Sequence, residues 1–425
     1  MTLSRKIFLF IVLNVAAMRL CALTSSSDTI KISLKDAEKR FLDQNLDLLI
    51  AKTDIDQAKG LLLQSKLYDN PSIDFERQLY DYDKKEFFPT SNYQYYASFN
   101  QLIKTAGKYV KGIQIARQQV KLSEYEYYDV LRALKYALKE NFYQIYQDQQ
   151  KMNVLANGIN ELNKLIDAIT IQVEKGYVAK KELVRLQSSL LDFMNDQTEA
   201  YNRITESESE LKQLLSYKGN EYIIPQVEDS VNTLPSKIEK LVFDSLQSIA
   251  FANRYDLLAA GQQADIGKNE WQLAKKQAIP DVSIGADYDR LGTFNSGYSG
   301  LMLQLPVPLW NLNQGNVKAA KAQYDQLRLE KDKKELEVHN TLQQEYAKLL
   351  NENRLYKLAN KNYQDSFEEI YKNIYDSYKS RTINLIEFLE YFESYKDTKF
   401  NLIEINSGLL IQSQKLNFEL GKDIF

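Results

Sequence analysis

The feature that most constrains the fold is an internal repeat relating the two halves of the chain. Asp47–Ala51 aligns with Asp256–Ala260 at a shift of 209 positions (256 − 47), and the same shift, without a gap, aligns identical residues as far as Pro71 and Pro280. Repetition on this scale predicts two copies of one structural unit. The copies are expected at residues 30–217 and 237–425, with a linker at 218–236.

Each copy has the same expected order of elements: helix, strand, strand, long helix, turn and helix. In the first copy the opening helix is expected to begin at Ser33, because Ser33 and Asp36 have the spacing that caps free amides at a helix N-terminus. It is expected to end before Pro71, and its counterpart before Pro280, since proline cannot continue the helical hydrogen bonds.

Four segments alternate between apolar and polar residues, which predicts strands with one apolar face. At about ten residues each, they have the length of strands in a membrane β-barrel. The polar face includes Asp74, Glu76, Asp287 and Asp289, expected to face a lumen either as a cation-favouring lining or as the polar surface of any porous barrel. The apolar face is expected to carry Ile73, Phe75, Leu79, Tyr93, Tyr95, Ala97, Phe99, Val282, Ile284, Ala286, Tyr288, Leu301, Leu303, Leu305 and Val307.

The long helices show a coiled-coil spacing, in which apolar residues recur at alternating steps of four and three. A helix from Thr105 to Val173 would be roughly 100 Å long at 1.5 Å per residue, which exceeds the needs of a globular domain. The expected seam consists of Leu155, Ile159, Leu162, Ile166, Ile169 and Val173, and in the second copy of Phe367, Ile370, Ile374 and Tyr378.

The N-terminus has the pattern of a secretory signal peptide, expected at residues 1–22. Arg5 and Lys6 precede the apolar run Ile7–Met18, which is too short to span a bilayer as a helix. Cleavage is expected near Ala22, and lipidation of Cys21, the single cysteine, is the alternative. The mature chain contains no later run of 18 apolar residues, so any membrane insertion is expected to use strands.

Composition argues against several classes of function. The net charge of -3 gives no basic patch for nucleic acid. One histidine, one cysteine and 5 methionines predict no transition-metal site, and no cofactor or catalytic motif is visible, so an enzyme is not expected. With 15 glycines, 7 prolines and 26% charged residues, the chain favours long exposed helices over a compact globule.

Several motifs resemble the TolC-like outer membrane efflux channels, and in particular their cobalt-zinc-cadmium resistance group. Gln304–Asn316 is similar to that group's strand-to-helix signature, and Gln101–Lys108 is similar to its counterpart in the first copy. Ile32–Ala37 with Asn45–Leu48 resembles the family's opening helix. The resemblance covers nearly all of the mature chain.

The resemblance implies a fold that is mainly α-helical with a small membrane β-barrel. Each protomer would supply four transmembrane strands and long coiled-coil helical hairpins, and three protomers would form a 12-stranded barrel on an α-helical tunnel. It implies a channel in the outer membrane of a Gram-negative type envelope, with a large periplasmic portion. The implied partners are two further copies of the chain, outer-membrane lipid, a periplasmic adaptor and an inner-membrane pump, expected to be proton-driven, that would send small molecules or metal cations outwards.

The resemblance also implies roles for residues at the two hairpin tips and at the strand-helix junctions. Arg381, Glu387 and Glu390 resemble a periplasmic gate with glutamates in place of aspartates, although one additional residue separates Ile383 from the first acid. The alternative is that these acids are ordinary solvated positions. The tips expected to contact an adaptor are Lys175, Gly176, Tyr177, Val178, Ser380, Thr382 and Ile383, and the junction residues are Gly107, Trp310 and Gly315.

For the junctions, Gly107 and Gly315 are expected to permit a backbone bend or close approach. Trp310 would either anchor the membrane interface or pack at the turn. Three other functions remain open: the outer-membrane component of a type I protein secretion system, a periplasmic adaptor and a coiled-coil scaffold. An adaptor would need a Gly-rich lipoyl-like module, and a scaffold would leave the four alternating strands unexplained.

Overall fold

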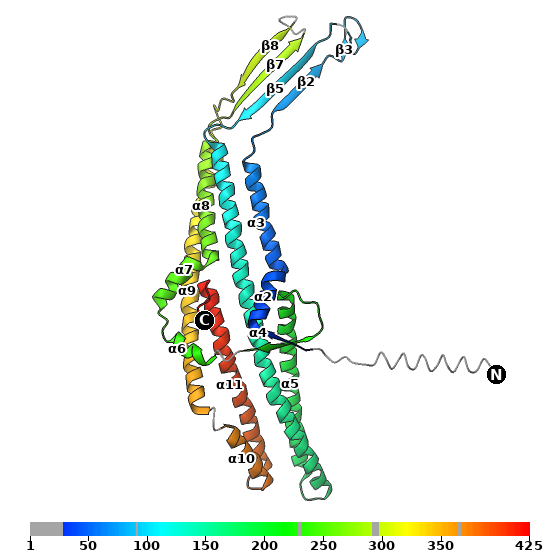
Figure 1. Ribbon diagram of the computed structural model, residues 1–425, viewed down its shortest axis with the longest axis vertical. Helices are drawn as coiled ribbons and strands as arrows, with labels where there is room; N and C mark the ends of the chain where they lie inside the picture. Colours follow the sequence, from blue (N-terminus) through cyan, green and yellow to red (C-terminus); the bar gives the residue numbers. More distant parts are fainter. Residues whose placement is uncertain (1–28, 91, 228–230, 291–296, 364–366) are drawn as a thin grey trace, which may run out of the picture.

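The computed structural model describes residues 29–90, 92–227, 231–290, 297–363 and 367–425, except for the side chains of residues 360–372. The expected signal peptide with Cys21, and the expected loop at 291–296, lie outside the described residues. The molecule is long and narrow, with a sheet at one end and paired helices along its body (Figure 1).

The opening helix of each half is broken in two, which corrects the prediction of a single helix. In the first half, Ser33 caps α2 (Leu34–Gln44) as predicted, by accepting a hydrogen bond from the amide of Asp36. The helix then stops at Asn45, whose extended backbone ends α2 while its side chain caps α3 (Leu46–Ser65). The second half breaks in the same way at Arg254, between α7 (Phe243–Asn253) and α8 (Tyr255–Lys276).

The sheet consists of four antiparallel strands in the order β2-β5-β7-β8. Their register confirms the two predicted faces, because the row Ile73, Phe99, Ala286, Leu301 is apolar and the row Asp74, Ser98, Asp287, Gly300 lies on the opposite face. The strands are β2 (Ser72–Arg77), β5 (Tyr95–Ile103), β7 (Val282–Arg290) and β8 (Tyr298–Gln304).

Some predicted strand residues lie outside the strands. Leu79 follows β2, Tyr93 precedes β5, and Leu305 and Val307 follow β8. The last two are excluded because the prolines at 306 and 308 lack the amide that a ladder hydrogen bond needs. Between β2 and β5, an unpredicted hairpin forms from β3 (Tyr80–Asp81) and β4 (Glu86–Phe87).

The long helices bear out the predicted length. The helix α4 (Lys108–Glu174) has 67 residues, or roughly 100 Å, and it packs against α5 (Lys180–Leu214) along the predicted seam. In the second half, α9 (Gln314–Tyr363), α10 (Phe367–Lys379) and α11 (Leu385–Leu420) occupy the corresponding positions. The side chains of Phe367 and Ile370, two expected seam residues, lie outside the described set.

No helix in the described part of the chain is both long and apolar enough to cross a bilayer.

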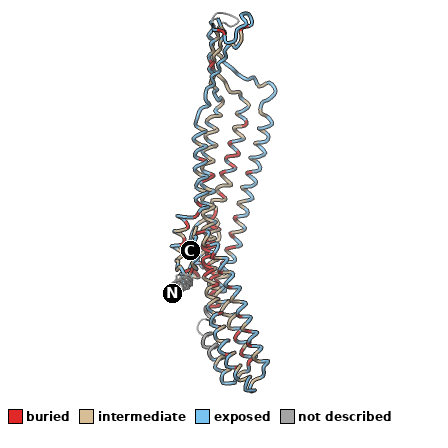
Figure 2. The backbone as a smooth tube through the Cα atoms, turned by 90° about the vertical axis from the view of Figure 1, so that its right-hand side faces the viewer, coloured by how far each residue is buried: buried red, intermediate tan, exposed pale blue. Residues whose placement is uncertain are grey.

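A compact region surrounds the helices near their middle, where buried residues are concentrated (Figure 2). Here β1 (Thr29–Ser33) pairs in parallel with β6 (Tyr222–Gln226), which lies within the expected linker. The same linker includes η1 (Val231–Thr233) and the start of α6 (Leu234–Ile238). Ile223 of β6 and Leu234 and Ile238 of α6 are buried, so these two elements pack into the core.

Candidate functional site

The two hairpin tips lie at the end of the molecule farthest from the sheet (Figure 1). One tip connects α4 to α5 and carries Lys175, Gly176, Tyr177 and Val178. The other connects α10 to α11 and carries Ser380, Arg381, Thr382 and Ile383. The structure therefore brings both sets of predicted tip residues to the same end.

Both tips have the same backbone geometry, but different residues occupy the left-handed position. In the first, Gly176 has φ +76°, and the amide of Tyr177 donates to the carbonyl of Gln172. In the second, Arg381 has φ +59°, and the amide of Thr382 donates to the carbonyl of Ser377. These are the hydrogen bonds of a Schellman motif, whose left-handed residue is usually glycine. Arg381 therefore holds a left-handed backbone conformation that is unfavourable for any residue with a side chain.

The predicted gate carboxylates lie on the first turns of α11, and one of them has a structural role that the sequence analysis missed. Glu387 forms a capping box with Asn384: each backbone amide donates to the other residue's side chain, at 3.0 and 3.1 Å. The Asn-x-x-Glu spacing was the signal that would have revealed it. Glu390, one turn on, is exposed, as are Glu387 and Arg381.

The two tips share one apolar cluster, so they form a single structural unit. Val178 and Leu183 from the first hairpin and Tyr378 and Ile383 from the second pack against this cluster. Burial raises the pKa of Tyr378, and the negative charge of Glu182 raises it further.

The strand-helix junctions differ from each other. At the first, Gly107 has φ +71° and begins α4, as expected for a bend. At the second, Gly315 lies inside α9 and the left-handed residue is Asn313, with φ +60°, so the bend predicted at Gly315 is wrong. Asn313 tolerates this conformation because its side chain hydrogen-bonds locally, accepting from Asn316 at 2.7 Å. The same side chain also donates to the carbonyl of Ala274 on α8 at 2.7 Å.

Trp310 is 86% exposed, so it does not pack at the turn within this chain. The first junction instead depends on Asp281, which the sequence analysis did not single out. Its carboxylate accepts hydrogen bonds from the amide of Thr105 and the amine of Lys108, both at 2.8 Å. Asp281 thereby ties the start of β7 to the turn between β5 and α4.

The four acids expected to line a lumen share the polar face of the sheet. Asp74 and Asp287 flank Ser98 in one row, and Glu76 and Asp289 flank Tyr96 in the next. Ser98 donates a hydrogen bond to Asp74 at 2.9 Å. Two adjacent rows therefore present carboxylates on one surface. No cluster that would hold a metal ion occurs among the described residues.

A buried charge network holds the break between α7 and α8, and it too was missed. Arg254 binds Asp256 through two nitrogens, at 2.7 and 3.0 Å, and also bonds to Glu419 near the end of α11. Burial opposes ionisation of Asp256, but hydrogen bonds from Arg254 and the charges of Arg132 and Lys334 outweigh it and lower the pKa of Asp256. Arg254 aligns with Asn45 in the repeat, so the two breaks fall at equivalent positions of the two halves.

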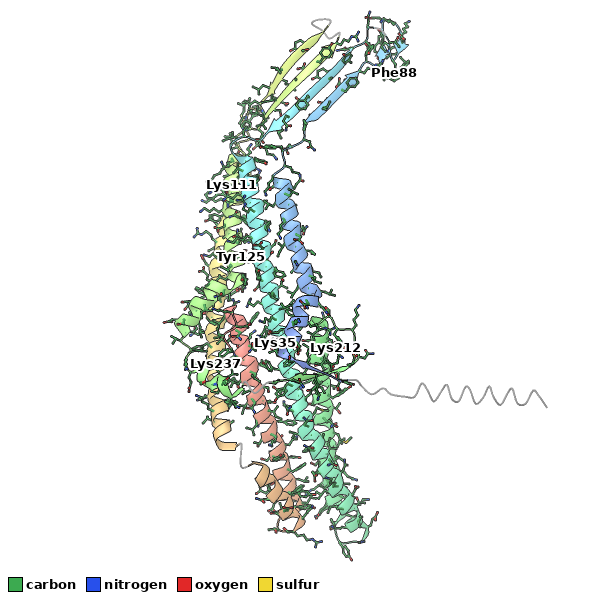
Figure 3. The ribbon with its side chains drawn as sticks, in the orientation of Figure 1. Lys35, Phe88, Lys111, Tyr125, Lys212 and Lys237 are labelled. Carbon is green, nitrogen blue, oxygen red and sulfur yellow. The ribbon has the colours of Figure 1, made fainter. Side chains whose placement is uncertain are left out.

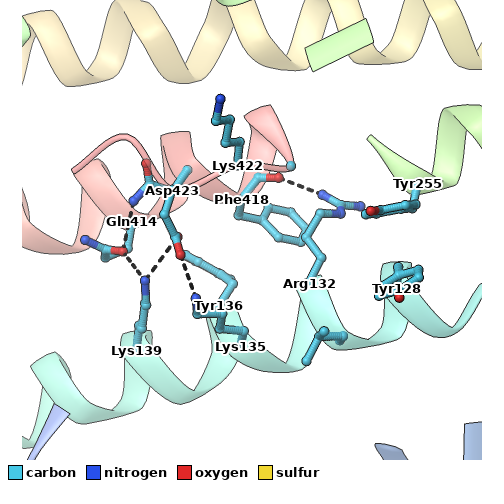
Figure 4. Close-up of a pocket in the computed structure, with 13 residues that line it drawn as sticks. Tyr128, Arg132, Lys135, Tyr136, Lys139, Tyr255, Gln414, Phe418, Lys422 and Asp423 are labelled. Carbon is cyan, nitrogen blue, oxygen red and sulfur yellow. Dashed lines mark hydrogen bonds and ion pairs between the residues drawn. The ribbon is translucent and has the colours of Figure 1, made fainter. Parts of the chain in front are cut away.

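Ion pairs join residues that line a pocket beside the C-terminus (Figure 4). Lys135 and Lys139 of α4 contact the two carboxylate oxygens of Asp423 at 2.6 and 3.2 Å. Burial opposes ionisation of Asp423, but these lysines lower its pKa overall. These two ion pairs fix the C-terminal segment against α4.

Comparison with known proteins identifies this architecture. The family model of the outer membrane efflux protein matches twice, at residues 37–216 and 246–422. A comparison with curated protein sequences finds no match.

Solved structures share the fold at low sequence identity. CusC, solved in a study of folding and transmembrane channel formation, is 15% identical, with 94% of this chain and 95% of that chain covered and a TM-score of 0.74. The Campylobacter jejuni CmeC outer membrane channel is 15% identical, with 91% and 85% covered and a TM-score of 0.74. The Vibrio cholerae outer membrane protein VceC is 14% identical, with 92% and 97% covered and a TM-score of 0.72.

The family match covers most of the chain, and it favours the channel over the adaptor, the scaffold and any enzyme. The chain therefore belongs to the outer membrane efflux protein family, and it is an outer-membrane efflux channel protein.

Proposed function

We propose that three copies of this chain close one barrel in the outer membrane and one helical tunnel beneath it, which conducts small molecules or metal cations outwards. Members of the family are trimeric outer-membrane channels that work with an adaptor and an inner-membrane pump. For this chain, an adaptor and a proton-driven pump would supply the energy and most of the substrate choice.

The observation that carries the proposal is the open sheet. In the order β2-β5-β7-β8, each of β2 and β8 has a neighbour on one side only among the described strands. In hydrocarbon, each unpaired amide or carbonyl costs several kcal/mol. Pairing β8 of one copy with β2 of the next removes both edges, and three copies of four strands give the twelve-stranded barrel.

Exposed apolar side chains on the helices support the same assembly. On α3, Leu46, Ile50 and Leu61 are exposed although the helix packs against α4. On α9, Leu329 and Leu336 are exposed. These two helices lie on opposite sides of α4 and α8 (Figure 1). A neighbouring copy that packs its α9 against this α3 would bury both sets of exposed apolar side chains in the tunnel wall.

Purification tests the assembly directly. The protein should be recovered from the outer membrane as a detergent-dependent trimer that shifts in electrophoretic mobility on heating. A monomer that stays in solution without detergent would contradict the proposal.

The gate at the tips is part of the proposal. Rings of Glu387 and Glu390 around the axis would attract cations, and Arg381 would hold the closed state through charge-assisted hydrogen bonds to a neighbouring helix. The left-handed backbone of Arg381 supports this role, since strain at a functional position is often retained for the side chain.

Single-channel recording in planar bilayers tests the gate. Glu387→Gln is a clean variant because glutamine can also complete a capping box. Combined with Glu390→Gln, it should reduce block by multivalent cations, while Arg381→Ala should open the closed state. As a control, Arg185→Gln removes one exposed charge from α5. Unchanged block and conductance in both gate variants would show that these residues are ordinary surface residues.

The tips are proposed as the contact surface for the adaptor. Tyr177 is 76% exposed, and Thr382 is also exposed. A photo-crosslinking residue at either position should capture the adaptor. The matched control is Tyr82 in the loop at the opposite end of the molecule, 84% exposed. Capture from Tyr82 alone would contradict the orientation.

Two further parts of the proposal concern the membrane region. The carboxylates Asp74, Glu76, Asp287 and Asp289 would line the lumen and favour cations, which reversal potentials of charge-neutralised variants would test. Trp310, exposed beside the sheet, would anchor the inner interface of the membrane.

Finally, we propose that residues 1–22 are removed on export and that 30–217 and 237–425 are two copies of one unit. The matching order of strands and helices in the two halves supports the second point. Mass analysis of the N-terminus of the exported protein tests the first.

A further inference from the structure

The end of the sheet farthest from the helices carries an unusual arrangement of charge. Arg77 on β2 and Arg290 on β7 both pair in register with Tyr95 on β5, so the three residues form one row across three strands. This row lies at the end of the sheet near Phe88, away from the helices (Figure 3). By strand alternation it belongs to the apolar face.

Both arginines converge on one aromatic ring. The guanidinium carbon of Arg77 lies 4.6 Å from the ring centre of Tyr93, and that of Arg290 lies 5.4 Å from the same centre. Arg290 also lies 5.9 Å from the ring centre of Tyr95. Stacking on aromatic rings holds the two planar cations at the surface.

The two charges are not neutralised by the part of the chain that the structure describes. Neither arginine forms an ion pair there, and the one hydrogen bond from a guanidinium goes to the carbonyl of Pro89, from Arg77 at 3.2 Å. The nearby Asp289 points to the opposite face, where it accepts a hydrogen bond from Gln94. Apart from the arginines, the strand residues on this face are uncharged: Ile73, Phe75, Tyr95, Ala97, Phe99, Gln101, Ile103, Val282, Ile284, Ala286, Tyr288, Ser299, Leu301 and Leu303.

The position of the row matches the edge of a bilayer. From Val282 to Arg290, β7 rises roughly 27 Å along the strand at about 3.4 Å per residue. At a strand tilt of about 40° this is roughly 21 Å along the membrane normal, which places Arg290 near the edge of an apolar band of about 25 Å. Arginine costs little there, whereas it is strongly unfavourable at the midplane. Two adjacent cations on a lipid-facing surface fit an anion that the lipid itself supplies.

We propose that Arg77, Tyr93 and Arg290 form a binding site for the phosphate groups of an outer-leaflet lipid. Guanidinium groups match phosphate oxygens in pairs, and the tyrosine rings provide the apolar contact that lipid offers beside its headgroup. The inference rests on the proposed placement of the sheet in the membrane. It adds a ligand on the outside of the channel, separate from the conducted substrate.

The test uses the purified full-length protein in detergent, titrated with a diphosphorylated glycolipid and followed by native mass spectrometry. The double variant Arg77→Gln/Arg290→Gln should bind at least about tenfold more weakly. Arg185→Gln/Arg328→Gln, which removes the same charge from α5 and α9, should bind as the wild type does. Arg77→Lys/Arg290→Lys should fall between, because lysine keeps the charge but loses the paired geometry.

Two further arms keep the test decisive even if the glutamine variant misfolds, which circular dichroism would reveal. The same glycolipid after phosphatase treatment should bind the wild type as weakly as the intact lipid binds the glutamine variant. Inorganic phosphate at equal concentration should not displace the intact lipid. Equal binding of the dephosphorylated lipid, or displacement by inorganic phosphate, would overturn the lipid-phosphate site. Failure of the proposed membrane placement is distinguishable, because the protein would then stay soluble without detergent.

Discussion

Placing an arginine on successive residues of β8 tests the strand register and the membrane face together. Leu301 is 92% exposed on the apolar face and pairs with Ala286, the fifth of the nine residues of β7, so it lies near the middle of the sheet. A lipid-facing arginine near the midplane costs about 2 to 4 kcal/mol. Leu301→Arg should therefore lower the free energy of unfolding by that amount per protomer.

Arginine at two neighbouring positions of β8 shows how the loss of stability depends on depth and on face. Leu303 is on the same face but two residues nearer the helices, about 7 Å along the strand. Leu303→Arg should cost less than Leu301→Arg, because the penalty declines towards the interface. Met302 pairs with Gly285 on the opposite, polar face, so Met302→Arg should cost little.

The assay is denaturant unfolding of protein inserted in phospholipid vesicles, with heat-dependent electrophoretic mobility as the measure of folded protein. The expected order of damage is Leu301, then Leu303, then Met302. Equal damage at Leu301 and Met302 would refute the assignment of faces, and greater damage at Leu303 than at Leu301 would refute the depth.

Three more predictions concern the helices. Arg254→Met should destabilise the fold by roughly 3 to 5 kcal/mol, measured by chemical denaturation, because it leaves the buried carboxylates of Asp256 and Glu419 with less compensation. Because the pKa of Asp256 is lower in the folded state, its contribution to stability is present above about pH 4 and should be lost as the pH falls further; in Asp256→Asn, the acid-induced loss of stability should be smaller. Asn384→Ala should cost about 1 kcal/mol in thermal unfolding by removing a helix cap, and Ala179→Asn at the other tip should add a similar amount, since that helix begins without a side-chain cap.

Features of the candidate site that depend on residues close together in the sequence could be predicted, whereas those that depend on distant contacts could not. The positions of the tips came from motifs that resemble the family, and the faces of the strands came from alternation, because both patterns involve neighbours within a few residues. The capping box at Glu387 had a local signal as well. The left-handed backbone at Arg381 had none, since the residue that local rules expect at this position of a Schellman motif is glycine.

By itself, the sequence determined the elements that local rules govern: the length of α4, the alternating faces of the strands and the helix start at Ser33. Only the tertiary structure decided where the opening helices break and what secures the breaks. Arg254 contacts Glu419, which is 165 residues away, and Asn45 contacts the carbonyl of Leu214, which is 169 residues away. No local pattern encodes such partners, because they meet only after the long helices have folded back along one another.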